Sequence, residues 1–377
     1  MSKDYRQTWV RACALCIDAI GSVLFAFQKK PHIDRESILF LTLIKLDRIG
    51  DTFLAEPTIA AIRTLFPRAR VRMIVAPWNR SVVENNPAID ELVTLPSALD
   101  VQKESFGSFL KSKNVAPLVA LLRSQACDMA VDLQGNPLNV MAMWRAGIPI
   151  RVGLKGKLLS FLLTHAAPVA RDAHQAEIYF SLARLLGWVG QMPLPKIYPS
   201  GSDASTVSRF IVEHRLKSFA VFHLGAGRSY RQWPLAFFIA LGKKMHERYT
   251  DIIPVIVGGA DDAAMALQFS AAVPGAINAA GKLSIPQTYE LLKTAVLFVG
   301  SESGPAHLAG ALGVPTLVFM SRWSGISRWK PLGSWVTVLA SKNIHSCPGI
   351  LCTQNPCPNM AAITVDEALS AVAKFLS

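Results

Sequence analysis

The amino-acid sequence predicts an α/β protein made of two doubly wound domains that face a central cleft. Three observations predict this fold class. Short aliphatic runs alternate with longer segments of helical periodicity, which is typical of βαβ units and parallel sheets. The pattern stops at residues 187–203, a stretch rich in Gly, Pro and Ser, and then starts again. The 377 residues, 51% of them hydrophobic, are enough to build two cores.

The first half of the chain contains three strand candidates and four helical segments. The strands are expected at residues 38–44, 71–76 and 128–133. The helices are expected near residues 57–66, 117–126, 136–147 and 174–187. Pro57 fits the first turn of a helix and hardly any other helical position, so the loop that carries Asp51 is expected to run to about Ala55.

The second half repeats this alternation after the linker. Its strands are expected at residues 219–224, 253–257, 296–300 and 315–320. Its helices are expected near residues 234–248, 261–272, 286–295, 304–313 and 366–376. The predicted organisation is an N-terminal amphipathic segment at 1–35, a first domain at 36–190 and a second domain at 191–377.

The segment before the first domain is interpreted as an amphipathic helix. The chain is apolar from Ala12 to Phe27 except for Asp18 and Ser22. The charge of Asp18 and the lack of a small-x-small cleavage site argue against a signal peptide, and the run is shorter than the ~20 residues that span a bilayer. Such a helix either lies in a membrane interface or caps the globular body. On a helical wheel a polar stripe opposes an apolar one: Asp4, Arg11, Asp18, Ser22 and Lys29 against Trp9, Cys13, Cys16, Ile20, Leu24 and Phe27.

The charge balance points to an anionic partner. The sequence has 39 Lys and Arg against 26 Asp and Glu, a formal net charge of +13. Nucleic acid, a phosphorylated substrate and an acidic membrane surface all fit such an excess. Nucleic acid is the weakest of the three, because no short stretch interleaves basic residues with aromatic ones as a stacking groove does.

The cysteines do not form the disulfide framework of a secreted protein. They are Cys13, Cys16, Cys127, Cys347, Cys352 and Cys357. The last three are evenly spaced in SCPGILCTQNPCPN and lack the CxxC pair of a zinc ribbon. The simplest interpretation is a Pro-rich loop that contains thiols. A metal or redox role for these three is left open, and a catalytic role is not expected.

The stretch IKLDRIGDTFLAEP places four charges around one glycine directly after an aliphatic strand. Charged side chains are costly to bury inside a sheet. Lys45, Asp47, Arg48 and Asp51 are therefore expected where the strand has already left the sheet. Ligands of open α/β sheets bind at the carboxyl ends of the strands. Gly50 is expected to let the backbone approach a ligand closely.

Three segments of the second half also follow strands and suit an activated nucleotide. In HLGAGRSYRQWP, Gly225 and a second glycine precede Arg228 and Arg231, a loop suited to anions. GGADD places two carboxylates where ribose diols are recognised in nucleotide sites. GSESGPAHLAGALGVP begins a helix whose free N–H groups and dipole suit a diphosphate.

Each of these segments also has a purely structural interpretation. Gly-rich turns after strands are common without ligands, and His307 in an apolar helix is more often a satisfied core histidine than a catalyst. Trp233 with Pro234 is most simply a packed helix start. Neither a P-loop nor a GxGxxG occurs, which disfavours an ordinary ATPase or dehydrogenase. The joint occurrence of the segments in this order is far more specific than any one of them.

Together the segments resemble glycosyltransferase family 9, the lipopolysaccharide heptosyltransferase group. The resemblance runs from about Ile38 to the C-terminus and includes LIKLDRIGDTFLAEPTIAAIRTLFPRARV, DMAVDLQGNP and AGKLSIPQTYELLKTAVLFVGSESGPAHLAGALGVPTLVF. It implies a GT-B fold of two Rossmann-like domains. It also implies an inverting transfer of heptose from ADP-heptose to an anionic lipopolysaccharide inner-core acceptor, without a required cofactor.

The resemblance assigns roles residue by residue. It makes Asp51 the catalytic base and Arg231 the cation that faces the diphosphate of the donor. Arg231 stands where the family usually has Lys, and Glu302 stands where it usually has Asp. The donor is expected to contact Gly225, Arg228, Arg231, Asp261, Glu302, Ser303, Gly304 and His307. Acceptor phosphates and carboxylates are expected to meet Lys45, Arg48, Arg63, Arg80, Arg145 and Arg151.

Alternatives remain for the acceptor, the donor and the role of Asp51. Transfer to a protein such as an autotransporter, transfer of another sugar, and a catalytically silent nucleotide-sugar binding protein each fit part of the pattern. Asp51 is otherwise a loop or helix-capping residue. The expected location is the cytoplasm, with peripheral attachment to the inner face of the cytoplasmic membrane if the N-terminal helix binds lipid.

Overall fold

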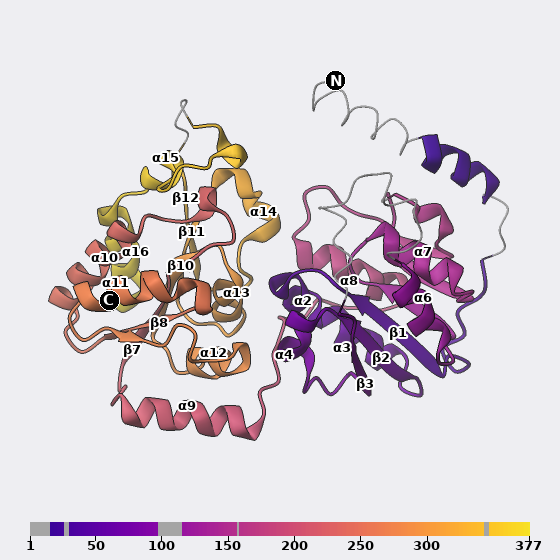
Figure 1. Ribbon diagram of the computed structural model, residues 1–377, viewed down its shortest axis with the longest axis horizontal. Helices are drawn as coiled ribbons and strands as arrows, with labels where there is room; N and C mark the ends of the chain where they lie inside the picture. Colours follow the sequence, from indigo (N-terminus) through magenta and orange to yellow (C-terminus); the bar gives the residue numbers. More distant parts are fainter. Residues whose placement is uncertain (1–15, 26–29, 97–114, 157, 343–346) are drawn as a thin grey trace. The chain divides into compact units, whose positions relative to one another are not determined.

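The protein is described as a computed structural model (Figure 1), which covers residues 16–25, 30–96, 115–156, 158–342 and 347–377. Parallel β-sheets flanked by α-helices make up this part of the chain, as the sequence predicts. None of the helices in these ranges is long and apolar enough to cross a membrane.

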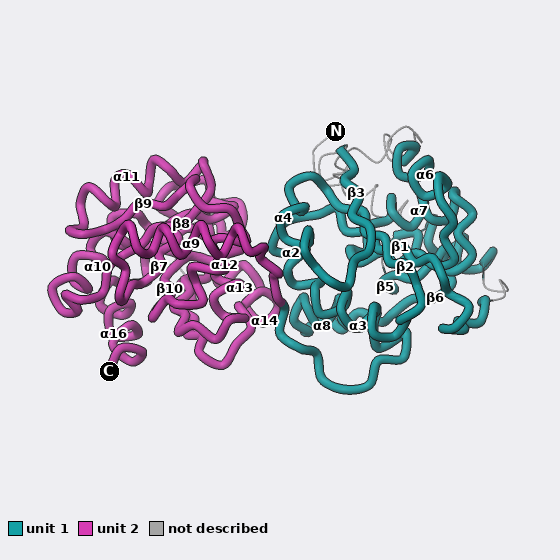
Figure 2. Tube along the Cα trace, turned by 90° about the horizontal axis from the view of Figure 1, so that it is seen from below, with its two compact units in different colours: residues 1–195 teal, residues 196–377 magenta. Residues whose placement is uncertain are grey.

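The chain divides into two compact units, Met1–Pro195 (unit 1) and Lys196–Ser377 (unit 2), drawn in different colours in Figure 2. The division falls within residues 191–200, which have no regular structure, close to the boundary expected at 190. Each unit has its own cluster of buried hydrophobic side chains.

Unit 1 contains a six-stranded sheet in which all neighbouring strands are parallel. Its strand order is β3-β2-β1-β4-β5-β6, the order of a Rossmann fold. Chain connections leave β1 and β4 in opposite directions along the sheet, so the topological switch point lies between these two strands. The strands are β1 Phe40–Lys45, β2 Arg70–Val75, β3 Glu91–Thr94, β4 Met129–Asp132, β5 Ile150–Leu154 and β6 His165–Ala167.

Helices cover both faces of this sheet. α3 packs against α8, and α6 packs against α7 (Figure 1). The helices are α2 Ile49–Leu54, α3 Glu56–Leu65, α4 Arg80–Val83, α6 Ala116–Arg123, α7 Pro137–Arg145 and α8 Gln175–Leu185, with short 3₁₀ helices η1 Pro77–Asn79 and η3 Ser160–Leu162. A further helix spans residues 16–24.

Unit 2 repeats the same topology with its own six parallel strands. The strand order is β12-β11-β10-β7-β8-β9, which again places a switch point between the first strand and the fourth strand of the unit, β7 and β10. The strands are β7 Phe219–His223, β8 Ile253–Val257, β9 Ile277–Asn278, β10 Leu297–Ser301, β11 Thr316–Met320 and β12 Val336–Ala340.

The helices of unit 2 also form two layers, with α10 against α11 and α16, and α12 against α9 and α13. Trp233 sits in the core beneath α10, where its ring stacks on Phe319 and its indole N–H donates to the carbonyl of Ile363 (2.9 Å). The helices are α9 Gly201–Glu213, α10 Leu235–Arg248, α11 Ala263–Ala272, α12 Ile285–Leu292, α13 Gly304–Ala311, α14 Ile326–Trp329, α15 Pro358–Ala361 and α16 Val365–Leu376, with 3₁₀ helices η4 Ser229–Arg231, η5 Ala260–Asp262, η6 Arg322–Ser324 and η7 Gly349–Leu351.

Every strand and helix predicted within the two domains is present and begins within two residues of its expected start. Of the predicted N-terminal amphipathic segment, residues 1–15 and 26–29 lie outside the described residues. Two expectations about the connections were wrong. The residues after Arg48 form α2 rather than a loop to Ala55, so Asp51 lies in the first turn of a helix. The linker ends at α9, which begins with a capping box in which Ser200 and Asp203 each bond the other's backbone N–H.

Candidate active site

The carboxyl end of β1 carries a buried lysine that organises the switch point of unit 1. The side chain of Lys45 is fully buried, and its ammonium donates to Asp47 (3.0 Å) and to the carbonyl of Leu133 (3.3 Å). The same ammonium lies 3.7 Å from the centroid of the Tyr179 ring. Lys45 is therefore committed to contacts inside the unit, which corrects its expected contact with an acceptor.

Asp51 projects from the first turn of α2 and is held by a tyrosine. The hydroxyl of Tyr179, a buried residue of α8, donates to Oδ1 of Asp51 at 2.7 Å. Burial and the nearby carboxylates of Asp51 and Asp47 raise the pKa of Tyr179 well above its ordinary value, so this hydroxyl remains a donor. Asp51 makes no side-chain capping bond in α2. Its carboxylate is thus oriented by tertiary structure, with Oδ2 left without a partner among the described residues.

Removing the Tyr179 hydroxyl tests this contact. In Tyr179→Phe we expect kcat to fall about tenfold, because a hydrogen bond to a charged group is worth about 1.5–3 kcal/mol. The KM for a ligand of unit 2 is expected to stay unchanged, since Tyr179 is a buried residue of unit 1. Steady-state kinetics measure both constants, and Tyr249→Phe, the same deletion in unit 2, serves as the control. An unchanged kcat in Tyr179→Phe would show that Asp51 needs no such support.

Neighbouring loops hold the chain around Asp47. The indole N–H of Trp78 and the amide of Asn79 both donate to the Asp47 carbonyl, at 2.7 and 2.9 Å. Burial raises the pKa of the Asp47 carboxyl to about 6, while Lys45 opposes and Asp51 adds to this shift. Arg80 follows Asn79 at the start of α4, so it lies at this same edge of the sheet.

The loop after β4 completes the edge from the other side of the switch point. The fully buried carboxylate of Asp132 accepts from the backbone N–H groups of Gln134 (3.1 Å) and Asn136 (2.8 Å) and from the amide of Asn139 (2.9 Å). Burial raises the pKa of Asp132 in spite of these donors. The motif DMAVDLQGNP therefore shapes the loop beside Asp51.

Three arginines predicted to meet the acceptor lie elsewhere. Arg63 makes two hydrogen bonds to Asp90 (3.0 and 3.1 Å) near the starts of β2 and β3, the edge opposite Asp51. Arg145 ends α7 just before β5, also at that edge. Arg151 is buried in β5, where it donates to the carbonyls of Leu162 (2.8 Å) and Ile148 (2.6 Å). The guanidinium groups of Arg63 and Arg151 bond other groups of unit 1, and Arg48 and Arg80 remain candidates for the acceptor.

Gly50 stands directly before Asp51, and its close approach to a ligand stays a prediction. It lies within α2, and a Cβ added there would meet no atom within 4 Å. The backbone is therefore not crowded at this position, and the space beside it stays open next to Asp51.

In unit 2 the loop after β7 packs against a carboxylate that the sequence did not single out. A Cβ at Gly225 would collide with Asp262, so glycine is required for this approach. Asp262 accepts from the backbone N–H of Gly259 (2.9 Å) and faces His223 Nε2 at 3.5 Å. The contact with His223 lowers the pKa of Asp262, with burial opposing it. The predicted ribose contact, Asp261, is exposed beside it.

Arg231 and Glu302 form an ion pair across the switch point of unit 2. Arg231 ends η4 after β7, and its guanidinium lies 3.1 Å from Oε1 of Glu302, which follows β10. Its Nε also donates to the hydroxyl of Tyr230 (3.1 Å). Burial raises the pKa of Glu302 and Arg231 opposes that shift. Arg231 and Glu302, the two positions at which the sequence departs from the pattern it resembles, therefore contact one another.

The start of α13 lies directly beside this pair. Ser303 is the N-cap residue but makes no side-chain cap, and its buried Oγ has no hydrogen-bond partner within the described ranges. A Cβ on Gly304 would meet no atom within 4 Å, so the space at the helix start is open. His307 is buried one turn further on. Open N–H groups at a helix start and a nearby guanidinium suit a diphosphate.

Sequence reasoning missed Tyr179 and Asp262 as parts of these sites. Tyr179 lies in an ordinary amphipathic helix, and nothing in its neighbourhood along the chain marks it. Asp262 stands next to Asp261 in GGADD, and either carboxylate fits the motif. Arg228 is exposed in the loop before η4, where the sequence predicted an anion contact.

Comparisons with known proteins agree with this architecture. The chain is 24% identical over 306 residues to lipopolysaccharide heptosyltransferase 3 of Escherichia coli, covering 75% of this chain and 83% of that protein. The fold matches the glycosyl transferase family 9 structure from Veillonella parvula (TM-score 0.74, 18% identity, 91% of this chain and 98% of that one). It also matches the ADP-heptose lipopolysaccharide heptosyltransferase II of E. coli (TM-score 0.71, 19% identity, 90% and 98%).

These structures share with the protein the GT-B type of fold, with two Rossmann-like units. The model of glycosyltransferase family 9 (heptosyltransferase) matches residues 115–355, which is well over half of the chain. The matched range contains Tyr179, Arg231, Glu302 and the start of α13. The protein is a glycosyltransferase and belongs to family 9, the heptosyltransferase family.

Proposed function

We propose that the protein transfers heptose from ADP-heptose to an anionic lipopolysaccharide inner-core acceptor with inversion at the anomeric carbon. The acceptor hydroxyl attacks from the side opposite the departing diphosphate, and a base removes its proton as the bond forms. Unit 1 supplies the base and the acceptor contacts, and unit 2 supplies the donor contacts. Membership of the heptosyltransferase family supports the sugar, and the net charge of +13 supports an anionic acceptor.

Asp51 is the proposed base. The observation that carries this assignment is the hydrogen bond from Tyr179, which occupies Oδ1 and leaves Oδ2 available to a hydroxyl. The buried Lys45–Asp47 ion pair lies in the same segment, at the carboxyl end of β1. Arg48 is exposed at the N-cap of α2 and is proposed, with Arg80, to contact acceptor phosphates or carboxylates.

The donor diphosphate is proposed to lie at the start of α13 next to Arg231. Ser303 and Gly304 offer N–H groups and an open approach, and Arg231 supplies the cation. Gly225, Arg228, Asp261 and His307 are proposed to line the nucleotide, and Glu302, which follows β10 beside Arg231, is proposed to contact sugar hydroxyls. The transfer is proposed to require no cofactor.

A donor and acceptor panel tests the proposal. The purified protein is incubated with ADP-heptose, or with UDP- and GDP-sugars, and with truncated core oligosaccharides or an autotransporter domain. Mass spectrometry is expected to show one added heptose on the core acceptor from ADP-heptose alone, and NMR of the product an inverted anomeric linkage. Transfer of a different sugar, or only to protein, would replace this assignment. Donor binding without any product would favour a silent binding protein.

We further propose that the N-terminal helix holds the enzyme at the inner face of the cytoplasmic membrane. Over residues 16–24 one side of the helix packs on unit 1, where Asp18 accepts from the backbone N–H of Leu159 (2.8 Å) and the ring of Phe25 lies 5.4 Å from that of Phe161. Three aliphatic residues on its other side are exposed: Ile20 (62%), Val23 (70%) and Leu24 (73%). The helix therefore has both a docking face and a free apolar face.

Polar substitutions on this free face test membrane attachment. In Ile20→Ser with Val23→Ser and Leu24→Ser, the partition coefficient onto anionic vesicles is expected to fall at least tenfold, because each buried aliphatic side chain contributes about 1 kcal/mol or more. Vesicle sedimentation measures the coefficient. Turnover of a soluble acceptor should not change. Val212→Ser with Leu267→Ser, at exposed positions of unit 2, is the control, and equal binding by all three proteins would exclude the helix as the anchor.

A further inference from the structure

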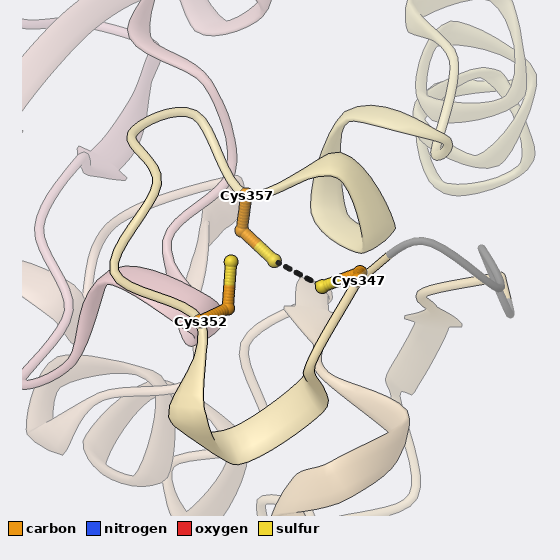
Figure 3. A group of neighbouring side chains, drawn as sticks. All are labelled: Cys347, Cys352 and Cys357. Carbon is orange, nitrogen blue, oxygen red and sulfur yellow. Dashed lines mark hydrogen bonds between the residues drawn. The ribbon is translucent and has the colours of Figure 1, made fainter.

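The loop that follows β12 brings three cysteine side chains together in unit 2. In the sequence four residues separate Cys347 from Cys352 and Cys352 from Cys357, yet the three sulfur atoms all lie within 4.8 Å of one another. The sulfurs of Cys347 and Cys357 are 3.6 Å apart, far beyond the roughly 2.05 Å of a disulfide bond. Figure 3 shows the three side chains pointing toward one another from separate parts of the loop.

These separations fit a single metal ion. A tetrahedral zinc ion with Zn–S bonds of about 2.3 Å holds its sulfur ligands roughly 3.8 Å apart. The pair formed by Cys347 and Cys357 already has nearly this spacing, and Cys352 reaches it with a small shift. Cys352 and Cys357 are 3% and 1% exposed, so the loop and the core shield the sulfurs from solvent, as in a structural metal site.

Two of the cysteines stand where the loop turns. Cys347 and Cys357 are each followed by Pro, and Cys357 is the N-cap residue of α15. Gly349 has a φ of +66°, a conformation that favours glycine. These turns bring the sulfurs of Cys347 and Cys357 to the same place in unit 2.

We propose that Cys347, Cys352 and Cys357 bind one zinc-like divalent metal ion as three thiolates. Thiolate sulfur selects zinc and related transition-metal ions over magnesium and calcium. Each thiol passes its proton to solvent as it binds, so the site carries one net negative charge and its affinity rises with pH. The ion stabilises the loop and takes no part in the transfer of sugar.

A hydrogen bond joins the cysteine loop to the segment that contains Arg231. The hydroxyl of Ser229 donates to the carbonyl of Cys352 at 3.0 Å, and Ser229 begins η4, which ends at Arg231. Loss of the ion is therefore expected to lower the melting temperature of unit 2 and to raise the KM for the donor. The effect on KM rests on the proposed role of Arg231, whereas metal binding does not.

Metal analysis of the full-length protein tests the site without any assay of transfer. Protein purified without chelators is expected to contain about one zinc or iron ion per chain by mass spectrometry. After removal with a mercurial and reloading with Co²⁺, sulfur-to-cobalt charge-transfer absorption is expected. Single variants Cys347→Ser, Cys352→Ser and Cys357→Ser should each lose the metal and that absorption. Cys127→Ser, at a half-buried thiol of unit 1 that contacts Thr42, should retain both.

Several outcomes would overturn the proposal. One such outcome is a wild-type protein that carries no stoichiometric metal after growth with added zinc and iron and shows no cobalt–sulfur absorption. A disulfide between Cys347 and Cys357 in the freshly isolated protein, or a metal content that the three Ser variants retain, would have the same consequence. Because the wild-type measurements need no substitution, the test stands even if a Ser variant fails to fold.

Discussion

Asp51→Asn is expected to lower kcat by about 100- to 10,000-fold, the usual range when a general base is removed. Asparagine keeps the shape of the side chain and still accepts the hydrogen bond from Tyr179 (2.7 Å), but it cannot take a proton from the acceptor hydroxyl. The substitution therefore separates the chemistry of the carboxylate from its place in the structure. Initial rates at saturating donor and acceptor measure the effect.

The stability and donor affinity of this variant distinguish the two interpretations of Asp51. The side chain makes no cap, so only its charge in the first turn of α2 is lost, which contributes about 0.3–1 kcal/mol. Melting temperature and donor Kd should remain nearly unchanged. Asp34→Asn, at an exposed turn before β1, is the charge-matched control. Near-normal turnover by Asp51→Asn would refute its role as the base.

Arg231→Ala is expected to lower kcat about 100-fold or more, the typical loss for a removed electrostatic donor. Negative charge grows on the diphosphate as the glycosidic bond breaks, so a fixed cation matters more in the transition state than in the ground state. Arg231→Lys should recover much of the rate, because the family pattern usually has Lys there. Arg209→Ala, on the exposed face of α9, controls for loss of positive charge.

The ion pair with Glu302 adds a structural effect that has to be separated. Without Arg231 the Glu302 carboxylate remains buried and unpaired, which lowers stability. Adding Glu302→Gln to Arg231→Ala removes that charge and should restore the melting temperature but not kcat. Recovery of both would make Arg231 a structural residue. A normal kcat with a raised donor KM would limit it to ground-state binding.

Much of the fold could be predicted from the sequence because it is encoded by neighbouring residues. The central strands β1, β4, β7 and β10 are short apolar runs, and turn residues mark their ends. The strands that were not predicted are short edge strands, or, in β5, a run interrupted by Arg151 and Gly153. The start of α9 could also have been predicted, because Ser200 and Asp203 form a capping box in the segment that was interpreted as linker.

The sequence by itself predicted the fold class and singled out the four segments after strands, with Asp51 and Arg231 among them, because each depends on residue types close together in the chain. Only the tertiary structure decided what those groups contact. Tyr179 meets Asp51, Arg231 meets Glu302, and three evenly spaced cysteines converge, because the order of strands and the folding of loops bring distant positions together. For the same reason Lys45, charged in the sequence like any surface residue, is buried in unit 1, where the carbonyl of the distant Leu133 accepts from its ammonium.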